Sequence, residues 1–232
     1  MNVASTKLSR RRLSAPVLAC AIIVGLAACS QEAEQERAAA DSTYSGRSTA
    51  SGDVHVTLLR TGNAVRGYGQ LGAEEFALSG VLSLEGPVVL NFADGRHMQG
   101  HLSLATNGST ITLTAFRERL SLSTDGVAGT SSAETSGPFT GSFAHEDAPG
   151  LQLLRIDLSR RGSLLTGAGT SAGKNIGLVA TETTTGVYNG VILFGDGSQV
   201  AMTLKQHEGS SDLNLSLVSG ASYRLKAMSP PN

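Results

Sequence analysis

Apolar residues recur at every second position over much of the chain after residue 43. The clearest runs are 76–84, 110–115 and 212–218, where Leu, Ile or Phe alternates with Ser, Thr or another small or polar residue. A period of two is typical of a strand with one buried face. No segment of this region has an apolar stripe at the helical period of 3.6 residues. The pattern therefore predicts an all-β protein.

Turn signals divide the apolar runs into short strands. Asp94-Gly95 and Asp196-Gly197 each lie between two such runs, and Asp-Gly favours a tight type I′ hairpin turn because both residues tolerate positive φ. The chain has 28 glycines and few charged residues, which fits many turns. We expect six to eight antiparallel strands per repeat, connected as meanders that form small barrels or sandwiches.

The chain also resembles itself at a distance of about 100 residues, with an offset that only increases along the chain. The matches fall into three groups. At an offset of 95, Tyr44–Gly46 and Val56–Arg60 match Phe139–Gly141 and Leu151–Arg155. At an offset of 100, Gly67, Gly69, Phe76 and Leu78 match Gly167, Gly169, Ile176 and Leu178, and at an offset of 102, Phe92–Gly95 and Leu102 match Phe194–Gly197 and Leu204. Their preserved order predicts an internal duplication with small loop insertions.

These matches define the expected domain organisation. We predict β repeat 1 over residues 44–124, a linker rich in small polar residues over 125–138, β repeat 2 over 139–227 and a short tail over 228–232. A repeat of this length can form its own core. The hydrophobic pattern leaves open whether the repeats are two separate domains or one fused sheet system.

The amino terminus has the features of an export signal. Lys7 and Arg10–Arg12 form a basic segment, and the apolar run 13–28 that follows is shorter than the ~20 residues needed to span a bilayer. Its last residues, Leu26-Ala27-Ala28-Cys29, resemble the lipobox of bacterial lipoproteins. The resemblance implies that residues 1–28 are a signal peptide, that Cys29 is lipidated, and that the protein is anchored to a membrane. Residues 29–43 are charged and rich in Ala, and we expect them to be a flexible tether.

The resemblance also implies a location. Ser30, as a residue other than Asp after the lipidated Cys, implies sorting to the outer membrane, facing the periplasm or the cell surface. Ser9–Leu13 is partly similar to a twin-arginine signal, and the export route stays open.

Removal of residues 1–28 changes the formal net charge from −1 to −5, because it removes four basic residues and no acidic one. The mature chain has no basic surface of the kind that nucleic acid requires. With Cys20 removed and Cys29 lipidated, it has no free thiol for a disulfide, a metal site or a nucleophile.

Few residues suggest catalysis. Gly169–Gly173 fits the G-x-S-x-G pattern of a nucleophile elbow, but a strand pattern follows it instead of the helix that the elbow needs, which favours a hairpin. His97 and His101 would lie about 13 Å apart along a strand, too far to share a metal ion. We therefore predict no enzyme activity, no cofactor and no metal site.

One short motif suggests a binding role. Ser219-Gly220-Ala221-Ser222-Tyr223 resembles the S-G-x-x-Y loop of periplasmic lysozyme inhibitors, although the second motif of that family is absent. The resemblance implies that Ser219, Gly220 and Tyr223 contact a cell-wall hydrolase. Our first hypothesis is a non-catalytic envelope lipoprotein that binds a protein, an envelope component or a small ligand. The alternative is an inhibitor of, or immunity protein against, a lysozyme-like hydrolase.

Overall fold

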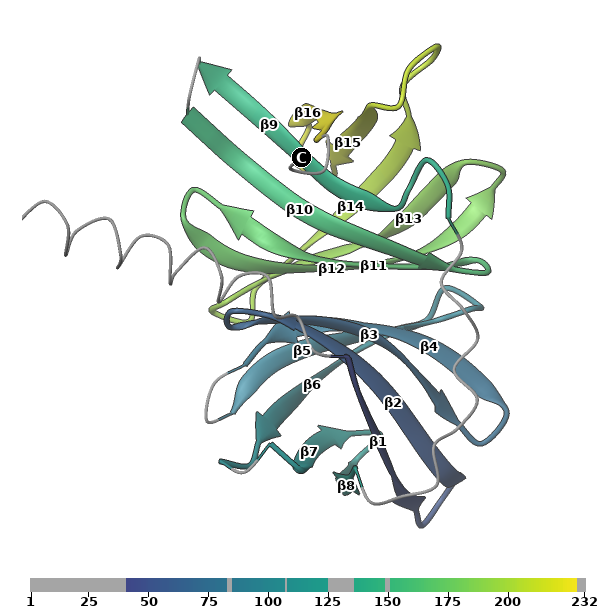
Figure 1. The fold of residues 1–232 in the computed structure, drawn as a ribbon. Helices are drawn as coiled ribbons and strands as arrows, with labels where there is room; N and C mark the ends of the chain where they lie inside the picture. Colours follow the sequence, from purple (N-terminus) through teal and green to yellow (C-terminus); the bar gives the residue numbers. More distant parts are fainter. Residues whose placement is uncertain (1–40, 83–84, 107, 125–135, 149–150, 229–232) are drawn as a thin grey trace, which may run out of the picture. The chain divides into compact units, whose positions relative to one another are not determined.

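The computed structural model describes residues 41–82, 85–106, 108–124, 136–148 and 151–228. They form two closed barrels in tandem, each with eight antiparallel strands that follow one another in chain order (Figure 1). The segments predicted as a signal peptide and as most of a tether (1–40), residues 125–135 of the predicted linker and the tail after residue 228 lie outside the described residues. The described part contains no helix with the length and apolar character needed to cross a membrane.

The first barrel is built from the first repeat. Its strands are β1 (Asp41–Ser48), β2 (Gly52–Thr61), β3 (Ala64–Leu71), β4 (Glu74–Val81), β5 (Gly86–Phe92), β6 (His97–Leu104), β7 (Thr110–Ala115) and β8 (Glu118–Ser123). The sheet closes where β8 pairs with β1, at Ser45 and Ser123. Closure leaves neither edge of the sheet unpaired. The first strand starts at Asp41, inside the segment predicted as a tether, because residues 41–43 pair with 57–59.

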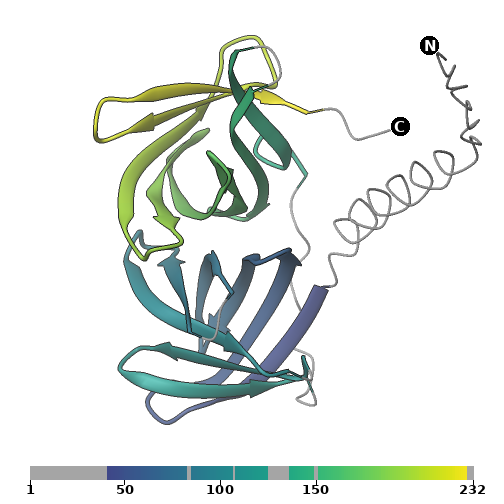
Figure 2. The same cartoon turned by 90° about the vertical axis from the view of Figure 1, so that its left-hand side faces the viewer.

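The second barrel repeats this arrangement. Its strands are β9 (Gly141–Ala148), β10 (Leu151–Arg161), β11 (Leu164–Ser171), β12 (Lys174–Thr184), β13 (Val187–Phe194), β14 (Gln199–Gln206), β15 (Leu213–Leu217) and β16 (Ser222–Ala227). It closes where β16 pairs with β9, at Lys226–Ala144 and Ala227–Phe143. The all-β class and the tandem repeat are confirmed, and each repeat forms a barrel. Figure 2 shows both meanders after a 90° turn.

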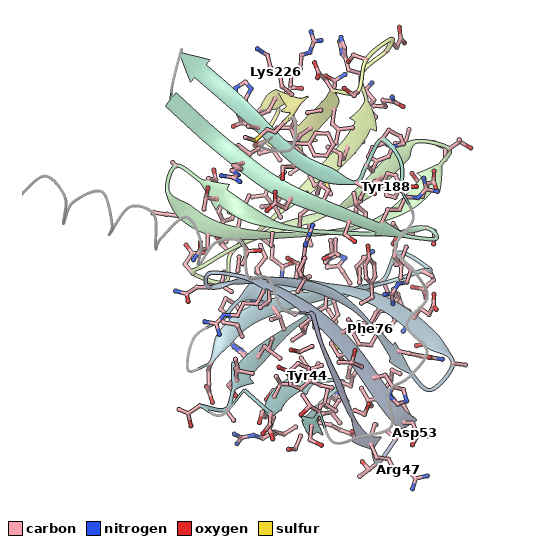
Figure 3. The ribbon with its side chains drawn as sticks, viewed as in Figure 1. Tyr44, Arg47, Asp53, Phe76, Tyr188 and Lys226 are labelled. Atoms are coloured by element: carbon pink, nitrogen blue, oxygen red, sulfur yellow. The ribbon has the colours of Figure 1, made fainter. Side chains whose placement is uncertain are left out.

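Alternate side chains of every strand fill the barrel interiors. In β2, Val54, Val56 and Leu58 are buried between more exposed neighbours. They belong to a core that includes Tyr44 and Phe76 in the first barrel, and a separate core around Tyr188 fills the second (Figure 3). The period-two pattern in the sequence is therefore the inward and outward alternation of barrel strands.

The strand register corrects part of the predicted repeat alignment. Gly62 and Gly162 end the equivalent strands β2 and β10, so Val56–Arg60 corresponds to Ile156–Arg160 at an offset of 100 and not to Leu151–Arg155. The side chains agree, since the Nε of Arg60 donates to the Gly62 carbonyl (2.8 Å) and that of Arg160 donates to the Gly162 carbonyl (3.1 Å).

The same register corrects the match of the first strand. Tyr44 pairs with Val56, and Phe143 pairs with Ile156. Tyr44 therefore corresponds to Phe143, and the predicted match to Phe139 was wrong. The offset of 95 aligned residues of similar type, but the strands that carry them differ in length and register.

The Asp-Gly hairpins lie where they were predicted, but their turn type differs. The loop between β5 and β6 has four residues, and only its glycine, Gly95, has positive φ (85°). A type I′ turn needs positive φ at both central residues, so that prediction was wrong. The Asp94 side chain instead accepts a hydrogen bond from the Arg96 backbone N–H (2.9 Å), and this bond lowers the pKa of Asp94. Asp196 and Gly197 repeat the arrangement.

The two barrels pack against each other through equivalent strands. β3, β4 and β5 of the first barrel contact β11, β12 and β13 of the second. The apolar part of this interface consists of Tyr68, Ala77, Val89, Leu164, Val179, Val191 and Leu193. Because the same three strands of each repeat take part, the contact resembles the interface of a two-fold symmetric dimer within one chain.

Buried hydroxyl groups add directional contacts to this interface. The Thr166 hydroxyl donates to the Leu78 carbonyl (2.7 Å), and the Thr181 hydroxyl donates to the Phe92 carbonyl (2.9 Å). The Leu178 backbone N–H donates to the Ser79 hydroxyl (3.3 Å). These bonds satisfy polar groups that the packing buries, and they set the register of one barrel against the other.

A glycine allows a close approach of the barrels. A Cβ atom on Gly177 would lie 2.6 Å from the Ser79 Oγ and 2.9 Å from the Gly80 backbone nitrogen, both in the other barrel. We expect Gly177→Ala to lower the free energy of unfolding by about 1–3 kcal/mol, because backbone of the first barrel must move. Urea unfolding measures the change.

Gly195→Ala is the matched control, since its Cβ would meet nothing closer than the Asn175 carbonyl oxygen at 3.8 Å. Equal stability of the two variants would contradict the close packing of the barrels at Gly177.

Candidate functional site

One end of the second barrel is closed by an aromatic pair. Phe139, just before β9, lies with its ring centroid 4.7 Å from that of Tyr188, and both side chains are buried. The Tyr188 hydroxyl has no hydrogen-bond partner among the described residues. Burial raises the pKa of this side chain to about 12, with a further contribution from the Glu182 carboxylate. Tyr188 is thus a neutral packing group at this end.

Aromatic rings fill one end of the first barrel. This end is equivalent to the end of the second barrel that lies opposite Phe139 and Tyr188. Phe76, Phe92 and Phe116 form a cluster with centroid distances of 5.8–6.3 Å. Outside it, the Arg96 guanidinium carbon lies 4.8 Å from the centroid of the Phe92 ring. Three aromatic rings therefore occupy the interior of the first barrel at this end.

The hairpin that supplies Phe116 has an unfavourable backbone conformation. Phe116 and Arg117, the two residues between β7 and β8, have φ of 57° and 60°. Such values are uncommon outside glycine and cost about 1–3 kcal/mol per residue. Packing of the Phe116 ring offsets this cost, because the hairpin turns that ring over Phe76 and Phe92.

The second barrel lacks this aromatic cluster. Ile176 replaces Phe76, and Phe194 is the counterpart of Phe92. By the strand register, Val218 is the counterpart of Phe116, but it points outward and is 80% exposed. Its hairpin has four residues, Val218–Ala221, instead of two. One ring is thus replaced by a smaller side chain and another has no inward counterpart, while Tyr223 takes the place of Leu120.

A cavity of about 160 Å³ occupies this end of the second barrel and is partly open to solvent. Its apolar lining is formed by Leu154, Ile176, Ile192, Phe194, Leu215 and Leu217. Ser171, Ala172 and Tyr223 complete the lining. Six strands of the barrel (β10–β13, β15 and β16) contribute to it, so the position of each lining residue depends on closure of the sheet.

Tyr223 faces the cavity because of its place in β16. It pairs with Leu215, whose side chain lies in the barrel core, and its own ring packs against that core. The His145 ring meets it edge to face, with centroids 5.3 Å apart. The Nδ1 of His145 is 3.0 Å from the Arg224 carbonyl oxygen, across the seam between β9 and β16. These contacts hold the Tyr223 ring at the side of the cavity.

The structure separates the three residues of the S-G-x-x-Y motif. Ser219 and Gly220 are exposed in the β15–β16 hairpin, where Gly220 has positive φ (92°). Tyr223 belongs to the strand beyond and faces inward. All three lie at the open end of the barrel. Cys29 lies outside the described residues.

The G-x-S-x-G segment is a hairpin. β11 ends at Ser171, Ala172 and Gly173 form the turn, and β12 follows, so the helix that a nucleophile elbow requires is absent. Ser171 nevertheless lines the cavity beside Tyr223. The sequence pattern therefore identified a residue of the candidate site, although for a chemistry that the local structure does not support.

The two histidines considered for a metal site lie on the surface. His97 and His101 are both exposed on β6. Within the described ranges, no three or more His, Cys, Asp or Glu side chains are grouped so that they could hold a metal ion.

A second, broader depression of about 630 Å³ lies over Pro138 and loop residues 206–211. It is formed by one loop and a single residue before β9, and its surface carries charged and polar groups, among them His207 and Glu208. It is more open to solvent than the cavity beside Tyr223. The cavity beside Tyr223 is therefore the stronger candidate.

Sequence reasoning missed the apolar lining of the cavity. Ile176 and Phe194 were matched to Phe76 and Phe92 only as evidence for the duplication. The exchange of a large ring at position 76 for a smaller side chain at 176 was a visible signal of unequal filling.

Comparisons with models of known protein families, with curated proteins and with solved structures found no match to this chain.

Proposed function

We propose that this protein is a non-catalytic envelope lipoprotein whose second barrel binds a small apolar group. The observation that carries the proposal is the cavity beside Tyr223, at the end where the first barrel is filled by Phe76, Phe92 and Phe116. A partly open cavity with apolar walls and a few polar groups is a typical small-ligand site. The first barrel then serves as a structural partner for the second.

The lining supports binding over catalysis. It contains no carboxylate, no histidine and no cysteine, so no acid–base pair or activated nucleophile faces the space that a ligand would occupy. The apolar walls favour burial of a ligand's apolar surface, at roughly 25 cal/mol per Å² removed from water.

Methyl NMR tests this proposal directly. The chain after residue 28 has four isoleucines: Ile111 in the first barrel, Ile156 deeper in the second, and Ile176 and Ile192 at the cavity. Benzene, as a probe, is expected to shift the Ile176 and Ile192 methyl signals and to leave Ile111 unchanged. No shift at either cavity residue would overturn the proposal.

A filling substitution gives the second arm of this test. Ile176→Phe introduces the ring that the first barrel has at Phe76, and we expect it to weaken benzene binding at least about tenfold, read at Ile192. Phe76→Ile is the reciprocal control, and it should leave the Ile192 response intact. Unchanged affinity in Ile176→Phe would mean that benzene binds elsewhere.

The membrane anchor is a separate part of the proposal. Cys29→Ser should remove the lipid attachment site, so that the protein moves from the membrane fraction to the soluble fraction. Detergent-phase partitioning and labelling with a fatty acid measure this. Cys20→Ser is the control and should behave like the natural chain, and membrane retention of Cys29→Ser would contradict the proposed anchor.

The hydrolase inhibitor is the second candidate function. It is favoured by the exposure of Ser219 and Gly220 in the hairpin, next to the exposed Val218. The mature chain would then slow lysozyme or a related hydrolase, and Ser219→Ala combined with Val218→Ser would weaken inhibition about tenfold or more. Arg117→Ala, at the matched hairpin of the first barrel, is the control. Unaltered hydrolase rates across a panel of such enzymes would exclude this candidate.

A further inference from the structure

We infer, on the basis of the proposed function, that the cavity of the second barrel selects a compact, uncharged group of about the size of one aromatic ring. This group carries a hydroxyl or similar hydrogen-bonding substituent that contacts Tyr223 and Ser171. Phenol is the simplest molecule with these properties. The inference follows from the volume of the cavity, the absence of charge in its lining, and the two hydroxyl groups beside its apolar walls.

The volume sets the size of the bound group. A closed cavity of roughly 150 Å³ lined by Leu, Ile and Phe is known to hold benzene. The present cavity is of about the same size, 160 Å³, and has the same types of lining residue. The Phe139–Tyr188 pair fills the opposite end of the barrel and prevents a longer group from passing through.

The lining also sets the charge. The Tyr223 phenol is the only ionisable group among the lining residues, which include no Lys, Arg, His, Asp or Glu. An ionised ligand group inside would lose its hydration without meeting an opposite charge, which is strongly unfavourable. Lys174 and Asp196, two charged residues of the hairpins that carry Ala172 and follow Phe194, are exposed and opposite in sign. The site should therefore discriminate against a carboxylate.

The two hydroxyl groups set the polar part of the ligand. Within the described residues, no hydrogen bond joins the hydroxyl of Tyr223 or of Ser171 to another group. A hydroxyl can both donate and accept, so either residue can bond a polar substituent on the ligand. The contact with His145 orients the Tyr223 ring before a ligand arrives, which lowers the entropic cost of binding.

Three probes of similar size separate these requirements. Benzene, phenol and benzoate are each titrated against the mature chain, with the Ile176 and Ile192 methyl signals as the readout. We expect phenol to bind about two- to tenfold more tightly than benzene, because of one added hydrogen bond. We expect benzoate to bind at least about tenfold more weakly than benzene.

Tyr223→Phe assigns the preference to one side chain. It should reduce the ratio of phenol to benzene affinity toward one. Tyr44→Phe is the matched control: it also removes one hydroxyl, which donates to the Gly108 carbonyl (3.0 Å) in the first barrel, and the ratio should remain as in the natural chain.

The outcomes distinguish the inference from the proposal on which it rests. If none of the probes shifts Ile176 or Ile192, the binding function itself fails. If benzene binds but phenol is no tighter, or if benzoate binds best, the second barrel binds apolar groups and the inferred selectivity is wrong. A phenol preference that survives in Tyr223→Phe would also overturn the role given to Tyr223.

Discussion

Closure of eight strands into a cylinder is the constraint on which the rest of this structure depends. Strand number and tilt set the width of the interior, so the inward side chains alone decide whether it is solid or hollow. The first barrel meets this constraint with Phe76, Phe92 and Phe116, one of them held by a strained hairpin. The second has Ile176 in place of Phe76 and turns Val218 outward, so the same cylinder contains a cavity.

The contact between the barrels involves the same strands that carry part of this difference. It uses mainly β3–β5 and β11–β13, which include Phe76 on β4 and Ile176 on β12, whereas Tyr223 and the hairpin 218–221 lie elsewhere in the second barrel. It also supports one wall of the cavity: the Gln99 side chain of the first barrel donates to the Gly197 carbonyl (3.0 Å), in the hairpin that directly follows Phe194. The two barrels therefore differ in their interiors while they share an interface built from equivalent strands.

Much of the fold was visible in the sequence, because strand periodicity and duplication are local or pairwise patterns. The alternation in 110–115 and 212–218 corresponds to β7 and β15, and Gly67 and Gly167 occupy equivalent places opposite Leu58 and Leu158. Alignment failed for the first strands, where Tyr44 was matched to Phe139. Residues of similar type lie there on strands with different register, and only the pairing across the sheet shows which residues are equivalent.

The candidate site was only partly predictable for the same reason. Tyr223 and Ser171 were both singled out, each through a motif, yet nothing in the chain order shows that they share one cavity with Leu154 and Ile192. The sequence by itself determined which side chains alternate inward and where the two repeats lie. The tertiary structure alone decided where the cavity of the second barrel lies. A cavity is the difference between the volume of a closed cylinder and the volume of its inward side chains, which here come from six separate strands.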